Sequence, residues 1–238
     1  MHMADKTIKN PLRKRILRDI RKEKGKYISI FLFLTFMISI VSGMLVTSLS
    51  MMHTYDDGIE TYKLEDGHFS TNSEISVADL QKIADQTDSG TAKATIYKQY
   101  FYNFDYTFEG NSNYSIRLYE NREALNTYSV FEGHAPEKDG ELAIDRLFAE
   151  NNNLKIGDTL TFDGKDLTIC GTVAVPDYSC LFENNSDSMF SATTFTTGFV
   201  TADYFKEFSE SKLTYSFAYR FSDRNLDDRA SYDASTDL

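Results

Sequence analysis

The sequence predicts an α+β protein: a single N-terminal transmembrane helix followed by a mixed α/β domain outside the cytoplasm. Three observations support this prediction. Residues 27–52 contain no charge, the charges on the two sides of this run differ in sign, and short strand and helix patterns follow one another from residue 67 to residue 222. These patterns interleave irregularly, without the spacing of β-α-β units, which favours α+β over a doubly wound parallel sheet.

The uncharged run has the length of a membrane span. As a helix, residues 28–49 would extend roughly 33 Å at about 1.5 Å per residue, close to the hydrocarbon thickness of a bilayer. A secretory signal has a shorter apolar region, about 7–15 residues, and a small-residue cleavage site, which residues 48–52 do not offer. A buried helix of a soluble protein rarely runs so far without a polar face. Residues 27–52 are therefore predicted to be a transmembrane helix.

The charge distribution predicts the orientation of this span. Residues 1–26 hold ten Lys and Arg against three acidic residues, whereas the chain after the span holds 15 basic and 33 acidic residues. Basic flanks stay on the cytoplasmic side, so we expect a plasma-membrane protein with a cytoplasmic N-terminus and an extracytoplasmic main domain. Nucleic-acid binding needs a basic surface, and the acidic domain argues against it.

The basic segment 1–26 is predicted to be a cytoplasmic arm that lies on the membrane surface. Asn10-Pro11 suits a helix start, with Asn as the N-cap and Pro at the first helical position. The basic side chains of this helix would reach anionic lipid headgroups; they are Arg13, Lys14, Arg15, Arg18 and Arg21. The alternative is a solvated tail that serves only as a topology signal.

Residues 53–66 are predicted to form a stalk that continues the helix beyond the headgroups. An apolar seam with helical spacing of three and four residues enters this segment from the span: Met52, Tyr55, Ile59 and Tyr62. The seam would either contact a neighbouring helix or fold back on the following domain.

Residues 67–222 are predicted to form the extracytoplasmic domain, and 223–238 a polar tail. Short helices are predicted where a capping residue precedes an apolar run; the caps are Ser76, Asp145 and Thr201. Strands are predicted where side chains alternate with a period of two; the clearest cover residues 100–108, 114–119 and 214–221. Asp163-Gly164, between two extended runs, predicts a hairpin.

One predicted strand carries an unusual density of aromatic residues on one face. They are Tyr100, Tyr102, Phe104, Tyr106 and Phe108, and Phe101 is the exception to the alternation. Such a face is either a sheet surface packed under a helix or a platform for an apolar or peptide ligand.

Residues 131–176, FEGHAPEKDGELAIDRLFAENNNLKIGDTLTFDGKDLTICGTVAVP, carry a more specific pattern. Its fixed points are Gly133 and Pro136, Gly140-Glu141 at a strand start, the short apolar helix 147–149, Gly157-Asp158 before a hairpin, and Gly171 with Pro176. This pattern resembles the periplasmic core domain of MacB-like and FtsX-like ABC transporter permeases. The basic run RDIRKEKGKY, which enters the apolar segment, is similar to the start of the first membrane helix of these permeases.

The resemblance implies a MacB-like extracytoplasmic fold and a mechanical role. Such a permease couples ATP hydrolysis by a separate cytoplasmic ABC ATPase subunit to motion of the outer domain, for export or mechanotransmission of a peptide, lipid-linked or antibiotic substrate. The implied partners are that ATPase, the remaining permease helices or a second permease copy, and the lipid membrane. Because a permease needs further membrane helices, we expect the chain to be the N-terminal part of a longer protein. The alternative is a complete single-pass protein with an extracytoplasmic interaction or sensor domain.

The sequence carries no recognisable catalytic, cofactor-binding or metal-binding motif. The histidines lack metal-ligand spacing, and His134 is interpreted as a loop residue. Residues 223–234 begin like a calcium loop but lack its central Gly and final Glu. A P-loop, a nucleophile elbow and a Gly-rich dinucleotide turn are missing. We therefore expect no cofactor, no metal and no enzymatic activity.

Cys170 and Cys180 are the two cysteines of the chain. In an oxidising compartment they would form one disulfide that closes the 170–180 loop. Two separate thiols are the alternative.

Overall fold

The computed structural model describes residues 18, 21–86, 93–108, 111–178, 181–183, 187–224 and 228–237. The chain divides into two compact units, one that ends at Asp57 and one that begins at Gly58.

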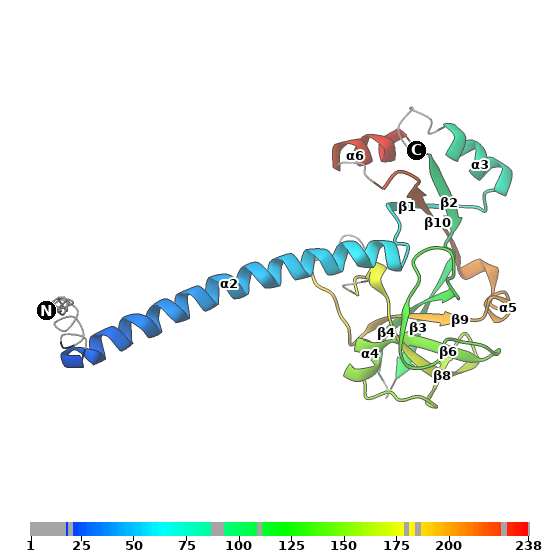
Figure 1. Cartoon of the computed structure of the whole chain (residues 1–238). Helices are drawn as coiled ribbons and strands as arrows, with labels where there is room; N and C mark the ends of the chain where they lie inside the picture. The colour runs from blue at the N-terminus through cyan, green and yellow to red at the C-terminus, as the bar shows by residue number, and fades with distance from the viewer. Residues whose placement is uncertain are drawn as a thin grey trace, which may run out of the picture. The chain divides into compact units, whose positions relative to one another are not determined.

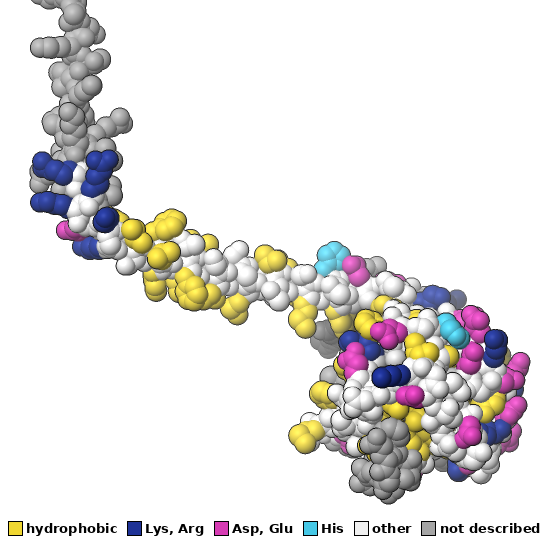
Figure 2. Space-filling model, turned by 90° about the horizontal axis from the view of Figure 1, so that it is seen from below, with side chains coloured by type: hydrophobic (Ala, Val, Ile, Leu, Met, Phe, Trp, Pro, Cys, Tyr) yellow, Lys and Arg dark blue, Asp and Glu magenta, His cyan; other side chains and the backbone are white. Residues whose placement is uncertain are grey.

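Helix α2 (Lys24–Thr61) makes up most of the first unit. It has no buried residue. Among the described residues it is the one helix that is long and apolar enough to cross a membrane, as judged by length and composition. Figure 2 shows hydrophobic side chains along it and Lys and Arg side chains at its beginning. Arg18 and Arg21 are exposed ahead of it, and Arg13, Lys14 and Arg15 lie outside the described residues.

The helix continues through most of the predicted stalk. It ends at Thr61, so residues 53–61 are helical and the chain then turns towards the first strand. Of the predicted apolar seam, Met52 and Tyr55 are exposed, whereas Ile59 and Tyr62 are half-buried. The last turn of the helix, from Gly58 onwards, belongs to the second unit.

The second unit is built on a mixed sheet (Figure 1). Its described strands are β1 (Gly67–Thr71), β2 (Ala94–Lys98), β3 (Phe101–Phe108), β4 (Asn111–Glu120), β5 (Ser129–Gly133), β6 (Glu141–Asp145), β7 (Thr159–Phe162), β8 (Lys165–Ala174), β9 (Phe195–Val200) and β10 (Leu213–Phe221). The main path runs β1-β10-β3-β4-β9-β6-β8-β5, with β2 on β10 and β7 on β8. The pairs β4–β9 and β6–β8 are parallel, and the other described pairs are antiparallel. Together with the helices, this mixed sheet fits the α+β prediction.

Strand β10 joins two parts of the sheet. Its C-terminal half pairs with β2, from Phe217 to Phe221. Its first residues, Leu213 and Thr214, pair with β3 instead. Strand β1 runs along its other edge.

The predicted helix caps are confirmed. The Asp145 carboxylate accepts hydrogen bonds from the backbone N–H groups of Leu147 (2.8 Å) and Phe148 (3.2 Å), at the start of α4 (Arg146–Asn151). Ser76 and Thr201 cap α3 (Val77–Gln86) and α5 (Ala202–Phe205) in the same way. These oxygens satisfy N–H groups that the first helical turn leaves unpaired.

The predicted hairpin is also present. Strands β7 and β8 pair with Phe162 opposite Lys165, which leaves a two-residue turn. Both turn residues have positive φ, 51° at Asp163 and 73° at Gly164. This is the turn that Asp-Gly favours because its twist matches that of the two strands.

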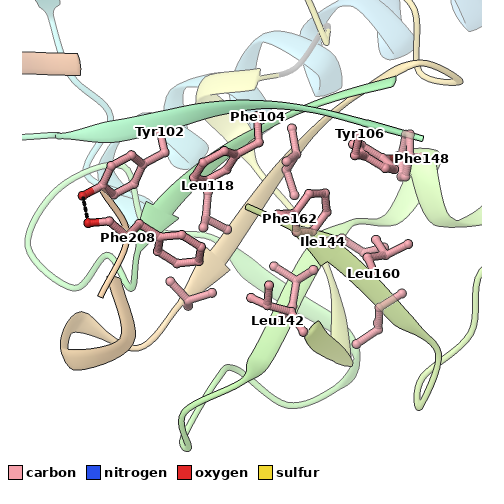
Figure 3. Close-up of a cluster of buried hydrophobic side chains, with 14 of the residues drawn as sticks. Tyr102, Phe104, Tyr106, Leu118, Leu142, Ile144, Phe148, Leu160, Phe162 and Phe208 are labelled. Carbon is pink, nitrogen blue, oxygen red and sulfur yellow. Dashed lines mark hydrogen bonds between the residues drawn. The ribbon is translucent and has the colours of Figure 1, made fainter. Parts of the chain in front are cut away.

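The core of the domain contains the predicted aromatic face (Figure 3). Tyr102, Phe104 and Tyr106 are 2%, 3% and 6% exposed. Tyr102 packs against Phe205 with 4.8 Å between ring centroids and the ring planes tilted by 52°, and its hydroxyl donates to the Phe208 carbonyl.

These aromatic side chains therefore correspond to the packed-face alternative, and the interpretation as a ligand platform is wrong for them. Burial against α5 and the residues after it leaves these rings no surface for a ligand. Tyr100 is half-buried against Tyr215 and Phe217. The Phe108 side chain lies outside the described residues.

The segment predicted as a polar tail contains a helix, α6 (Asp228–Asp237). Ala234 is 3% exposed and packs in a small cluster with Ala94, Tyr219 and Phe221. A short helix of polar residues is marginal in isolation. This one is stabilised by its contact with β10, which precedes it closely in the sequence, and with β2, which lies far away in the sequence.

Candidate functional site

A pocket of about 560 Å³ lies against strands β1, β10, β3 and β4 in the second unit. This volume is within the range of small-molecule sites, about 300–1,000 Å³. Its lining comes from the chain before and within β1, from β3, β4 and β10, and from the segment after β8. The lining residues that carry charge or a ring are Glu65, His68, Phe101, Arg117, Tyr119, Arg122, Asp177, Tyr178, Phe182 and Glu183.

A buried ion pair forms one wall of the pocket. Arg122 follows β4, and Asp177 lies in the 3₁₀ turn Pro176–Tyr178 after β8. The guanidinium Nη1 lies 2.6 Å from the Asp177 carboxylate, and the two side chains are 4% and 11% exposed. The guanidinium also stacks 3.9 Å from the centroid of the Tyr119 ring. Such stacking on an aromatic face favours a desolvated arginine.

Burial and pairing act in opposite directions on the titration of this pair. Burial raises the pKa of the Asp177 carboxyl, and the adjacent Arg122 charge opposes this shift. Burial alone would lower the pKa of Arg122, but the Asp177 charge outweighs it and the pKa is raised. The Arg122 guanidinium therefore stays protonated, and its positive charge faces Asp177.

Two atoms of this pair have no protein hydrogen-bond partner in the part of the chain that the structure describes. They are Nε of Arg122, a donor, and Oδ1 of Asp177, an acceptor. Buried polar atoms are usually satisfied. A group that both accepts and donates, such as a hydroxyl or an amide, matches what this wall offers.

Arg117, also in the pocket lining, connects several elements. Its guanidinium donates to the Asn103 side chain (3.0 Å), to the Tyr178 hydroxyl (2.8 Å) and to the Glu183 carbonyl (2.7 Å). It lies 4.6 Å from the centroid of the Phe101 ring. This arginine therefore fixes the segment after β8 against β3 and β4.

The tyrosine hydroxyls of the pocket are coupled to each other. Tyr119 and Tyr178 lie 2.8 Å apart, oxygen to oxygen. Burial raises the pKa of Tyr119 well above its ordinary value, so this phenol stays neutral near pH 7. Together with the two arginines, these groups offer hydrogen bonds and ring faces, which suits binding of a polar ligand.

A histidine and a glutamate lie at the rim. Nδ1 of His68 lies 2.6 Å from Oε1 of Glu65. The Glu65 carboxylate also accepts from the side-chain amide of Asn126, whose Oδ1 in turn accepts from the Glu65 backbone N–H at 2.9 Å. The hydrogen bond to Glu65 raises the pKa of His68, although burial opposes this shift. The rim thus carries both signs of charge.

The sequence analysis did not identify this pocket. None of the predicted aromatic-face residues lines it, but Phe101, the exception to their alternation, does. Two other signals were available in the sequence: Arg117 stands between Ile116 and Leu118 in a predicted strand, and Pro176-Asp177-Tyr178 follows another strand. Neither signal shows that the two segments meet, because 55 residues separate Arg122 from Asp177.

The other predicted site residues lie elsewhere. Cys170 is a buried thiol in β8, and Cys180 lies outside the described residues, so the disulfide stays a prediction. The arm residues Arg18 and Arg21 are exposed in the first unit.

Comparison with solved structures gives a distant similarity to a transporter domain. No protein-family model matches the chain, and no curated protein matches it. Among solved structures, the chain is similar to an extracellular domain of an ABC-type transporter. That structure is the extracellular domain of the noncanonic ABC-type transporter YknZ from Gram-positive bacteria, with 9% identity and a TM-score of 0.39, over 66% of this chain and 83% of that one.

Proposed function

We propose that this chain is the N-terminal part of an FtsX-like ABC transporter permease. In this proposal α2 crosses the membrane with its basic end in the cytoplasm, and the domain from Gly58 onwards lies outside. The chain itself is not an enzyme: a separate cytoplasmic ATPase subunit hydrolyses ATP, and the outer domain moves. The observation that carries the proposal is the unburied apolar helix α2, which has basic residues at its start and a folded acidic domain after its end.

The spacing of residues within 131–176 supports this proposal, since Gly133 and Gly171 occupy positions where a Cβ would clash. A Cβ at Gly171 would meet the carbonyl oxygens of His134 and Glu132, the latter at 2.9 Å. A Cβ at Gly133 would meet the Cys170 carbonyl and lie 2.9 Å from the Gly171 Cα. The two glycines face each other across the β5–β8 pair. The pattern that resembles MacB-like domains is thus explained by close contact of two strands.

The end of α2 offers a route by which helix motion would reach the sheet. The Glu60 carboxylate accepts from Arg220 in β10 and from Arg224 just after it, both at 2.9 Å. Arg224 also donates to both carboxylate oxygens of Asp66, and Asp66 accepts from the Phe221 N–H at 2.7 Å. Arg224 thus bridges the two carboxylates, with Nε on Glu60 and Nη1 on Asp66, and such charge-assisted hydrogen bonds are stronger than neutral ones. Displacement of the last helical turn would therefore be transmitted to β10.

The first experiment tests the topology that the proposal requires. Single cysteines would be placed at Lys22 and at Glu210, both exposed, in a chain with Cys170→Ser and Cys180→Ser. In intact cells a membrane-impermeant maleimide is expected to label the Glu210→Cys variant, and the Lys22→Cys variant only after permeabilisation. Labelling in the reverse order, or recovery of the chain in the aqueous fraction without detergent, would contradict the proposal.

The second experiment tests the ATPase partner. The proposal predicts an ABC ATPase gene beside the gene of this protein. The two proteins would be co-expressed, and ATP hydrolysis would be measured in the purified complex. The control replaces residues 27–52 by an unrelated apolar span. For a permease, the control variant is expected to purify without the ATPase subunit, because the first helix of a permease packs against its other membrane helices.

The pocket favours a second candidate function, a membrane-anchored domain that binds a polar ligand as a sensor. Its mixed charges and the two unpartnered atoms of the Arg122–Asp177 pair carry this alternative. In a sensor, α2 would serve only as an anchor, and an unrelated apolar span could replace residues 27–52. If the protein with the replaced span still binds the same partners as the wild type, the sensor is favoured.

A further inference from the structure

Three side chains with metal-binding atoms converge at the other end of the domain's sheet. His134 follows β5, Glu141 begins β6, and Cys170 lies in β8. One donor atom from each lies within 4.8 Å of the others. His134 is exposed, Glu141 half-buried and Cys170 buried, so the group spans the surface and the interior.

The backbone holds two of the three residues in place. The His134 N–H donates to the Cys170 carbonyl at 3.2 Å, and the Cys170 thiol donates to the His134 carbonyl at 3.4 Å. The facing glycines Gly133 and Gly171 bring these two strands unusually close. The nitrogen and sulfur donors are therefore brought together by strand pairing, before any ligand binds.

Backbone contacts also orient the polar side chains. Nδ1 of His134 lies 2.8 Å from the Ala135 carbonyl. Oε2 of Glu141 accepts from the backbone N–H groups of Glu137 (2.9 Å) and Lys138 (3.1 Å), which leaves Oε1 available. Metal-binding histidines and carboxylates are usually held by such outer hydrogen bonds, which fix the ring and the free oxygen.

We propose that His134, Glu141 and Cys170 bind a zinc ion, with a fourth position open to water. Nitrogen, carboxylate oxygen and thiolate sulfur are all zinc donors, and three protein ligands with one open position is a known zinc arrangement. With zinc–ligand distances of about 2.0–2.3 Å, tetrahedral ligands lie roughly 3.3–3.7 Å apart. The present separations are slightly larger, and the His134 side chain, which is 50% exposed, has room to rotate inward.

Zinc binding in this site would release the proton of the Cys170 thiol. Burial raises the pKa of Cys170 to about 11, and the charges of Glu141 and Glu137 act in the same direction.

The site competes with the predicted disulfide. A Cys170 sulfur bonded to Cys180 cannot donate to zinc as a thiolate. The proposal is independent of the permease hypothesis, because it rests on the folded domain alone.

The test uses the full chain without an affinity tag, reduced and in detergent micelles. Zinc would be titrated in competition with a chromophoric chelator, and cobalt(II) would serve as the spectroscopic probe. One zinc per chain is expected, together with a thiolate-to-cobalt charge-transfer band. Cys170→Ser should abolish that band, and His134→Gln and Glu141→Gln should each weaken zinc binding by about tenfold or more, as loss of one ligand does.

Two control variants match these changes. His68→Gln removes a histidine of similar exposure, 49%, that also contacts a carboxylate, and it should leave zinc binding unchanged. Cys180→Ser should do the same. Circular dichroism would verify that each variant is folded. The proposal would be overturned by the absence of stoichiometric binding, by a Cys170→Ser variant that binds like the wild type, or by a native Cys170–Cys180 disulfide in protein purified without reductant.

Discussion

Arg122 is a charged side chain that the fold removes almost wholly from water. Transfer of an ion into a protein interior is unfavourable by several kcal/mol, and a close counter-ion offsets this only when the geometry is good. Here the guanidinium has Asp177 at 2.6 Å and the Tyr119 ring at 3.9 Å. Loss of the counter-ion would leave a buried, unpaired charge.

Asp177→Asn is therefore expected to lower the free energy of unfolding by about 3–5 kcal/mol. The measurement is urea denaturation of the protein in detergent micelles. Glu207→Gln is the matched control, because it breaks an exposed ion pair with Lys165. The Lys165 side chain is 29% exposed and the Glu207 side chain 51%. An exposed pair contributes about 0–1 kcal/mol. Equal effects of the two variants would contradict the role assigned to the buried pair.

The protonation of His68, at the rim of the pocket, makes the stability of the domain depend on pH. Its pKa is raised, first by the hydrogen bond to Glu65, and the charges of Arg117 and Asp177 act on it in opposite directions. A histidine with a raised pKa in the folded state binds its proton more tightly there than in the unfolded chain. Its contribution is present in full below about pH 6.5 and is lost as the pH rises through the raised value.

The wild type should therefore exceed His68→Gln in stability at about pH 5.5, and this difference should disappear above about pH 8. Because the histidine is 49% exposed, the difference is expected to stay below about 1 kcal/mol. Denaturation midpoints of both proteins over a pH series provide the measurement. A difference that grows with pH would show that Glu65 does not favour the charged imidazole.

At the scale of elements, the β5–β8 pair depends on glycine. Gly133 has φ of 75°, and a Cβ there would also lie 2.8 Å from the Ile156 side chain. Gly164 in the β7–β8 turn has nearly the same φ, 73°, but a Cβ there would meet nothing within 4 Å. The two positions thus separate the effect of backbone conformation from that of close packing.

Gly164→Ala is expected to destabilise the domain by about 1–2 kcal/mol, the energy of a left-handed conformation for a residue with a Cβ. Gly133→Ala should add about 1–3 kcal/mol to this, because the strands must separate. Urea denaturation of both variants measures the difference. Similar values would mean that β8 moves aside without loss.

Elements defined by local chemistry could be predicted from the sequence, and elements defined by distant contacts could not. Asp145, Thr201 and Asp163-Gly164 act within three residues of themselves, so their caps and turn were predicted correctly. Helix α6 depends on Ala234 meeting a strand more than a hundred residues earlier. The pocket depends on Arg122 meeting Asp177, and the proposed zinc site on strand pairing between residues 133 and 171. The spacing of apolar residues along the chain does not show which distant segments come into contact.

At the scale of the whole molecule, the two units differ in what covers their apolar residues. In α2 these side chains are exposed, whereas the unit from Gly58 onwards has a core of its own. A core of this kind is the requirement for independent folding.

A fragment of residues 58–238 is therefore expected to fold without detergent, with the near-ultraviolet circular dichroism of the full chain. The full chain should need detergent or lipid, because the apolar surface of α2 would otherwise associate. Gel filtration and circular dichroism of both proteins test this. Aggregation of the fragment would indicate that α2 supplies part of the domain's stability.

The central position of strand β10 determines which parts of the sheet unfold first. Since β1 lies on one edge of it and β2 and β3 share the other, neither part of the sheet can detach while β10 stays paired. Backbone amides in such a strand exchange with deuterium only when the whole domain unfolds, whereas amides at sheet margins exchange by local fraying. The amides of residues 217–221 should therefore be among the slowest to take up deuterium, and those of β5 and β7 should be faster.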